Sequence, residues 1–216
     1  MFLHFYYMET KEAYNLWANQ YDTNENKTRD LEALSLRETL SQMYFNHALE
    51  LGCGTGKNTE WLVERVNTLT AVDFSTEMLA KAKSKITSNK VEFIRADLNE
   101  PWNFSKNIKY DLITFSLVLE HIENLSTIFE KLENVIEENG YVYIDELHPF
   151  KQYNGTKARF ETNEGLQIVP CFNHHISDFT NLALKFGYRI ITLHEYFDGD
   201  TNLEIPRILT ILLRKE

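Results

Sequence analysis

Residues 50–58 have the composition of a ligand-binding loop. They read Glu-Leu-Gly-Cys-Gly-Thr-Gly-Lys-Asn and lie between a short apolar run and a pattern typical of a helix. Glycine adopts positive φ without a steric penalty and lets a ligand approach the backbone closely. The amide groups that open the following helix then face any polar ligand bound there. The segment therefore predicts a strand, a tight turn and a helix start around a nucleotide-like ligand.

The spacing of the glycines distinguishes two kinds of ligand. A dinucleotide fingerprint has a third glycine three residues after the second, and the chain has Lys57 at that position. The glycines stand instead at Gly52, Gly54 and Gly56. Glu50 precedes them, and a carboxylate there disfavours a pyrophosphate but favours a ligand with an ammonium or sulfonium group.

Two further acids follow predicted strands. Asp73 can accept hydrogen bonds from both hydroxyls of a ribose, and Asp97 is placed to accept from an exocyclic amine. Each acid has a structural alternative. Asp73 could cap the next helix, although Ser75 is better placed for that, and Asp97 could be a solvated loop acid before Asn99. With Glu50, these acids mark the ends of three successive strands, and the combination favours one ligand site.

Hydrophobic periodicity predicts the elements that position these residues. We expect helices at 10–21, 29–43, 58–66, 76–86, 125–136 and 177–186, and strands at 47–51, 68–72, 91–97, 109–115, 141–147, 188–196 and 207–214. Strands that alternate with helices imply a parallel sheet covered on both faces. We expect the last two strands to pair antiparallel. The buried positions of the second helix are predicted to be Leu31, Leu34, Leu40 and Met43, and Ser177 is predicted to cap the last helix.

The whole chain, residues 1–216, is predicted to be a single domain. It divides into an N-terminal helical lid (1–46), a cofactor-binding core (47–147), a substrate-side insertion (148–175) and a C-terminal helix with a β-hairpin (176–216). The insertion shows no clear helix and is expected to contain a hairpin near Arg159, Glu161 and Gly165.

The composition limits the function classes. The chain is 43% hydrophobic and 25% charged, as in globular proteins, and its net charge of −10 argues against binding to duplex nucleic acid. Cys53 and Cys171 form no spacing pattern, which indicates a reducing compartment. Because no apolar run is long enough to span a bilayer and the N-terminus lacks a signal-peptide pattern, we expect a cytoplasmic location.

The motifs resemble those of the class I S-adenosylmethionine-dependent methyltransferases. The resemblance covers roughly residues 47–147 with specific motifs and the rest of the chain more loosely. Upstream of this range, the N-terminal residues resemble the lid of the small-molecule subgroup, to which the quinone-biosynthesis methyltransferases belong. The lid residues are Tyr14, Trp17, Tyr21 and Asp22. The core segments that carry the resemblance are 50–56 (ELGCGTG), 71–75 (AVDFS), 96–98 (ADL), 110–122 (YDLITFSLVLEHI) and 139–141 (NGY).

The resemblance implies a Rossmann-like α/β fold, with a mostly parallel seven-stranded sheet, helices on both faces and the last strand antiparallel. It also implies S-adenosyl-L-methionine as cofactor and S-adenosyl-L-homocysteine as product. The glycine backbone would then meet the methionine portion, and Asp73 would hold the ribose. The other implied cofactor contacts are Phe74 and Met78 at the adenine faces, Asp97 and Leu98 at its edge, the Ser116 backbone at the ammonium group, Tyr21 at the methyl end, and Glu50 and Asn58 in the first motif.

Methyl transfer is an in-line displacement, so the protein must orient the acceptor and exclude water. A general base is needed only when the acceptor arrives protonated. We expect His148 or His121 to be that base, with Glu146 beside them on the same rim. Lys157 and Arg159 are expected to attract an anionic acceptor, and the remaining predicted acceptor contacts are Tyr14, Trp17, Tyr153 and His174.

Each of these residues also has a structural alternative. The histidines could be turn, loop or helix-flanking residues, and the aromatic residues of the lid could serve packing alone. The basic pair could be neutralised by Glu161 and Glu164 on a hairpin surface.

The predicted function is methyl transfer to an oxygen or nitrogen atom of a small molecule. The alternatives are a methyltransferase for a protein- or carrier-bound carboxylate and a non-catalytic cofactor-binding subunit. A nicotinamide oxidoreductase is disfavoured by the missing third glycine. We predict no nucleic-acid or membrane partner, no metal, and a monomer or homodimer.

Overall fold

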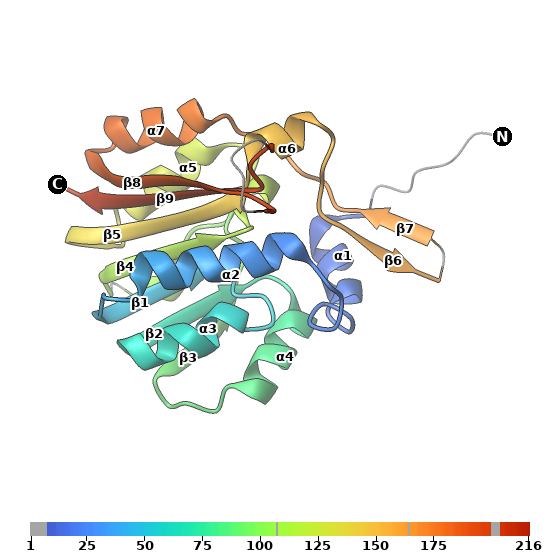
Figure 1. The fold of residues 1–216 in the computed structure, drawn as a ribbon. Helices are drawn as coiled ribbons and strands as arrows, with labels where there is room; N and C mark the ends of the chain where they lie inside the picture. The colour runs from blue at the N-terminus through green and yellow to red at the C-terminus, as the bar shows by residue number, and fades with distance from the viewer. Residues whose placement is uncertain (1–7, 107, 164, 200–203) are drawn as a thin grey trace.

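The computed structural model describes residues 8–106, 108–163, 165–199 and 204–216. The first seven residues of the predicted lid and Glu164 of the expected hairpin lie outside these ranges. One sheet of seven strands forms the centre of the molecule (Figure 1). Its strands are β1 (Phe45–Leu51), β2 (Val66–Asp73), β3 (Val91–Arg95), β4 (Tyr110–Ser116), β5 (Ile136–Leu147), β8 (Tyr188–Tyr196) and β9 (Ile208–Lys215).

The strand order is β3-β2-β1-β4-β5-β9-β8, with β1 to β5 parallel and β9 antiparallel to both of its neighbours. This confirms the predicted fold class. Parallel strands that alternate with helices carry all their carboxyl ends on one edge, so the loops after β1 to β4 meet there. The glycine loop, Asp73, Asp97 and Ser116 are all at that edge.

Helices cover both faces of the sheet. They are α1 (Thr10–Trp17), α2 (Lys27–Leu40), α3 (Lys57–Leu62), α4 (Thr76–Lys85), α5 (Leu125–Leu132), α6 (Pro149–Tyr153) and α7 (Ile176–Lys185). Because side chains alternate along a strand, Ile113 and Phe115 of β4 pack with α5 and α7, whereas Leu112 packs with α2 and α3 on the other face. None of the helices in the described ranges is long and apolar enough to cross a bilayer.

The predicted insertion contains a hairpin of β6 (Arg159–Thr162) and β7 (Gly165–Ile168), as expected, and also the short helix α6, which the sequence did not predict. The hairpin lies beside α1 (Figure 1). Trp17 and Phe160 stack there, with ring centroids 5.1 Å apart and planes inclined by 13°. The N-terminal helix and the insertion therefore form one wall beside the carboxyl edge of the sheet.

Several local predictions were wrong. The helix predicted at 10–21 ends at Trp17, and Val66, predicted to end a helix, begins β2. The helix predicted at 125–136 ends at Leu132, because Ile136 already pairs with Tyr110 as the start of β5. The N-cap of α7 is His175, two residues before the predicted cap Ser177, and the His175 amide donates to Asp178 at 2.7 Å. Ser177 is therefore inside the helix and does not cap it.

The buried face of α2 is more polar than predicted. Leu34 is 46% exposed, whereas Arg29, Glu32, Ser35 and Leu36 are buried. These four residues follow helical spacing, so their side chains lie on one face of α2, which is directed toward the interior of the protein.

Candidate active site

A cavity of about 410 Å³ lies at the carboxyl edge of the sheet. This volume is within the usual range of small-molecule sites. It is lined by most of the residues that the sequence predicts to hold the cofactor: Tyr21, Gly52, Gly54, Asp73, Phe74, Met78, Asp97, Leu98 and Ser116. The predicted residues Glu50, Gly56 and Asn58 do not line it.

The glycine loop is shaped by close packing and by left-handed backbone. Gly52 has φ +79°, and a Cβ atom there would lie 2.6 Å from Cγ2 of Val118. Gly56 has φ +84°, and a Cβ atom there would lie 2.8 Å from Cδ1 of Ile86. A side chain at either position would meet both a steric and a conformational penalty. Gly52 thus lets the backbone line the cavity, and Gly56 lets the start of α3 pack on α4.

Asp73 fixes the loop to the end of β2. Its Oδ2 accepts from the Gly54 amide and its Oδ1 from the Ser75 amide, both at 2.8 Å. Ser75 caps α4 by accepting from the Met78 amide at 3.1 Å, so Asp73 is not the cap. Burial raises the pKa of Asp73 to about 6.

Buried carboxyl groups gather behind the glycine loop. Glu50 accepts from the Thr59 hydroxyl and Glu32 from the Asn58 amide, both at 2.6 Å, and the two acids are only 4% and 3% exposed. Burial, with the charges of Glu32 and Asp73 nearby, raises the pKa of Glu50 to about 8. Burial also raises the pKa of Glu32. Neither acid has an ion-pair partner among the residues described.

Unpaired buried carboxylates favour a cation in the adjoining cavity. The sequence analysis missed Glu32, although its spacing of four residues from Leu36 on a helix was a signal that it faces inward.

The outer part of the cavity is formed by the loop after β3. Leu98 is buried there, whereas Asp97 is exposed and accepts from the backbone and side-chain amides of Asn99 at 2.9 and 3.1 Å. Asp97 therefore fits both predicted roles, because it lines the cavity, as a ligand contact would, and also closes a local turn, as a loop acid would.

The lid is tied to the glycine loop. The Thr55 hydroxyl donates to Asp22 at 2.6 Å, and Lys85 of α4 pairs with the same carboxylate at 2.9 Å. The guanidinium group of Arg29 lies 4.2 Å from the ring centroid of Tyr21 and donates to the Tyr21 carbonyl. These contacts hold Tyr21 against the cavity.

A second cavity, of about 340 Å³, lies between the lid and the insertion. Tyr14, Tyr21 and Leu117 line both cavities and so stand between them. Leu117 has φ +54°, a left-handed conformation that costs a side-chain-bearing residue about 1–3 kcal/mol. The surrounding fold imposes it, since the Leu117 amide donates to the Asp145 carbonyl at 2.8 Å.

His121 and Tyr14 form a hydrogen bond across these cavities. The Nδ1 atom of His121 lies 2.8 Å from the Pro170 carbonyl, which can only accept, so Nδ1 carries the proton. The other nitrogen, Nε2, then accepts from the Tyr14 hydroxyl at 2.8 Å. Burial raises the pKa of Tyr14 well above its ordinary value, which keeps the phenol protonated.

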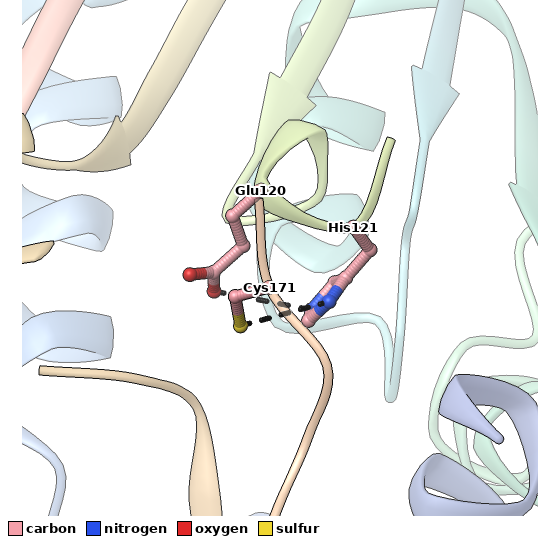
Figure 2. Close-up of side chains that lie close together, drawn as sticks. All are labelled: Glu120, His121 and Cys171. Atoms are coloured by element: carbon pink, nitrogen blue, oxygen red, sulfur yellow. Dashed lines mark hydrogen bonds and ion pairs between the residues drawn. The ribbon is translucent and has the colours of Figure 1, made fainter. Parts of the chain in front are cut away.

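Glu120, His121 and Cys171 lie close together at this point, with one potential ligand atom of each within 4.8 Å of the others (Figure 2). The glutamate approaches Nε2 of His121 at 3.8 Å, whereas the thiol approaches Nδ1 at 3.9 Å. A single cation cannot bind both nitrogens, and each already has a hydrogen-bond partner. Burial also raises the pKa of Cys171, which disfavours the thiolate that a metal needs. The three residues suit a hydrogen-bonded network better than a metal site.

The other predicted catalytic residues lie outside both cavities. His148 is fully buried, contacts Glu195 at 2.9 Å and accepts from the Phe150 amide at 3.1 Å. Glu146 accepts from the amides of Val118, Leu119 and Glu120 at 3.0, 2.8 and 3.3 Å. Glu146 therefore positions the loop after β4.

Of the predicted acceptor contacts, Tyr14, Trp17, Lys157 and Arg159 line the second cavity. Tyr153 and His174 do not. The Tyr153 hydroxyl contacts His175 at 2.5 Å, and Nε2 of His174 lies 2.8 Å from the Ile122 carbonyl, so these residues support surrounding loops. The sequence analysis missed Arg29, Glu120 and Arg207, which also line this cavity.

Comparison with known proteins agrees with this geometry. Residues 49–144 match a family model described as a methyltransferase domain. Malonyl-[acyl-carrier protein] O-methyltransferase from Priestia megaterium is 33% identical over 135 residues, which are 60% of this chain and 48% of that protein. The chain thus spans about half the length of this curated relative.

Two solved structures share the fold. DhpI in its complex with SAH aligns with a TM-score of 0.74 and 20% identity over 95% of each chain. The N-methyltransferase NodS from Bradyrhizobium japonicum, in complex with S-adenosyl-L-homocysteine, aligns with a TM-score of 0.72 and 16% identity over 96% of this chain and 99% of NodS. At these identities, the likeness concerns the fold alone.

Proposed function

We propose that this chain is a class I S-adenosylmethionine-dependent methyltransferase and transfers a methyl group to an oxygen or nitrogen atom of a small molecule. The observation that carries the proposal is the set of unpaired buried carboxyl groups behind the glycine loop, beside a cavity of about 410 Å³. A dinucleotide would bring negative charge to this place. S-adenosylmethionine brings a sulfonium and an ammonium group, whose positive charge favours the ionised form of these acids and is attracted by it.

The predicted contacts fit the parts of this cofactor. Asp73 keeps free lone pairs on oxygens that already anchor the loop, so it can also accept from ribose hydroxyls. Phe74 and Met78 supply apolar surface for the adenine, and the backbone at Gly52 and Gly54 is open to the amino-acid end. Tyr21, Tyr14 and Leu117 then stand at the boundary with the second cavity, where the methyl group would be presented.

S-adenosylmethionine supplies a methyl group on a positively charged sulfur. When a lone pair of the acceptor forms the new bond to this carbon, the electrons of the carbon–sulfur bond remain on sulfur, and the acceptor loses its proton. We assign that proton to the Tyr14 hydroxyl, whose own proton passes to Nε2 of His121. The Glu120 carboxyl, 3.8 Å from Nε2, stabilises the resulting imidazolium. His121 is thus retained as the base, and His148 is not.

The second cavity supports catalysis over a purely cofactor-binding role. A chain that only bound the cofactor would not need a second cavity beside the expected methyl position. A carrier-bound carboxylate remains the alternative acceptor, since a relative of this chain is named for malonyl-[acyl-carrier protein]. The division into lid, core, insertion and C-terminal part, the cytoplasmic location and a monomeric or homodimeric state stay predictions.

Thermal unfolding with added ligand tests the proposal. A ligand present at 100 times its dissociation constant stabilises the folded state by about 2.7 kcal/mol. We expect S-adenosylhomocysteine to raise the melting temperature and NAD and NADP to leave it unchanged. Stabilisation by the dinucleotides alone would reject the proposal. In the variant Asp73→Asn, S-adenosylhomocysteine should raise the melting temperature much less than in the wild-type protein.

A further inference from the structure

The second cavity is basic in a protein that is acidic. Its lining contains Lys27, Arg29, Lys157, Arg159 and Arg207 against two acids, Glu25 and Glu120, although the whole chain carries a net charge of −10. Arg207 is neutralised by Asp198, which also pairs with Lys151 at 3.3 Å. The other four cations have no ion-pair partner in the part of the chain that the structure describes.

Arg29 is the buried member of this group. It is only 8% exposed, and its Nη2 donates to the Asn24 carbonyl at 2.8 Å, while its Nε atom is buried without a hydrogen-bond partner. A buried guanidinium group is costly unless a carboxylate or another anion compensates its charge. Because Arg29 faces a cavity, a bound anion can supply that compensation.

Lys157 and Arg159 supply cations from the insertion. Both side chains are exposed; Lys157 precedes β6 and Arg159 begins it, in the hairpin that packs on the lid through Phe160 and Trp17. The sequence left open that acids of the hairpin neutralise this basic pair. Among the described residues, neither Lys157 nor Arg159 forms an ion pair with Glu161. Their charge is therefore available to a ligand between the lid and the hairpin.

Glu120 is a buried acid in the lining of this otherwise basic cavity. It is 5% exposed, and its Oε2 atom is buried without a hydrogen-bond partner. Buried polar atoms are nearly always satisfied, so this oxygen indicates that a ligand brings a donor. The carboxylate also repels an anion. It lies beside His121 (Figure 2), which lines the first cavity, where the methyl group is expected.

We infer that the second cavity selects an anionic methyl acceptor, whose carboxylate or phosphate oxygens bind Arg29, Lys157 and Arg159. Glu120 directs the anionic group away from the methyl position and accepts a hydrogen bond from a donor group of the acceptor other than the proton that passes to Tyr14. The inference rests on the proposed function, because it takes the first cavity to hold the cofactor.

The test uses small anions on the protein saturated with S-adenosylhomocysteine. Malonate and inorganic phosphate are titrated by calorimetry, with uncharged malonamide as the control. We expect at least one of the two dianions to bind saturably and malonamide not to bind. Tighter binding of malonate would indicate a carboxylate site, and tighter binding of phosphate a phosphate site. The inference is wrong if neither dianion binds better than malonamide.

Three variants locate the binding. The double substitution of Lys157→Gln with Arg159→Gln should weaken anion binding by at least about tenfold, which corresponds to about 1.4 kcal/mol. Lys83→Gln, at an exposed position of α4, should change nothing. Glu120→Gln should tighten the dianion by at least about fivefold, because it removes a like charge from the lining of the same cavity.

Equal anion binding in the double variant, or weaker binding after Glu120→Gln, would overturn the inference. The affinity for S-adenosylhomocysteine, measured in the same samples, should be the same in all variants. Failure of S-adenosylhomocysteine to bind the wild-type protein would instead reject the proposed function, so the two failures are distinguishable.

Discussion

Replacing Glu50 by glutamine should make the ligand-free protein less sensitive to pH. The pKa of this buried carboxyl is raised from an ordinary 4.5 to about 8 in the folded state. Between these two values, Glu50 is protonated in the folded chain and ionised in the unfolded chain. The unfolded state then binds fewer protons, so the free energy of unfolding falls as pH rises through this window.

The size of the effect follows from the two pKa values. Between pH 5 and pH 7, the titration of Glu50 alone removes roughly 2.5 kcal/mol from the free energy of unfolding, as an order of magnitude. Asp73 and Glu146, whose pKa values are raised to about 6 and about 8 by burial, act in the same direction and are kept in the variant. Glutamine has nearly the same shape and can still accept from the Thr59 hydroxyl.

Urea unfolding at pH 5, 6 and 7, followed by tryptophan fluorescence, measures this directly. The wild-type protein should lose stability over this range, and Glu50→Gln should lose roughly 2.5 kcal/mol less. Glu60→Gln, at an exposed position of α3, is the matched control and should follow the wild type. Parallel pH dependence in the wild type and Glu50→Gln would refute the view that Glu50 is an unpaired buried acid.

Three other substitutions test the site. Gly52→Ala should lower the free energy of unfolding in urea by about 2–4 kcal/mol, since it adds a steric clash to a left-handed backbone; an unchanged midpoint would contradict the loop geometry. Asp73→Asn should weaken S-adenosylhomocysteine by about 10- to 100-fold in calorimetry, the usual worth of hydrogen bonds to a charged group, whereas Asp178→Asn at the start of α7 should not. Tyr14→Phe removes the hydrogen bond to His121 and should slow single-turnover methyl transfer by about 10²-fold or more with cofactor affinity unchanged; equal rates would exclude the relay.

The fold and the cofactor cavity were predictable because their signals are local. A glycine at a position of positive φ, such as Gly52, and an acid at the end of a buried strand, such as Asp73, are placed by the backbone itself. Once the strands are parallel, the loops that follow them meet at one edge.

The acceptor side was less predictable because it depends on side-chain direction and on distant segments. Glu146 and His148 lie at the carboxyl end of β5, as predicted, yet the Glu146 side chain accepts from the amides after β4 and His148 contacts Glu195. Position at a strand end could not show this. Arg29 and Glu120 come from a helix and a 3₁₀ turn that are far apart in the sequence, and only the packing of the lid against the insertion brings them to one cavity.

The most direct test is a crystal structure of the protein with S-adenosylhomocysteine. We expect the ligand in the first cavity, with its ribose hydroxyls about 2.6–3.1 Å from the Asp73 carboxylate and its amino-acid end over the glycine loop, in front of Glu50 and Glu32. Its sulfur should face Tyr14 and the second cavity. A ligand bound outside this cavity, or one whose ribose lies away from Asp73, would contradict the proposed function.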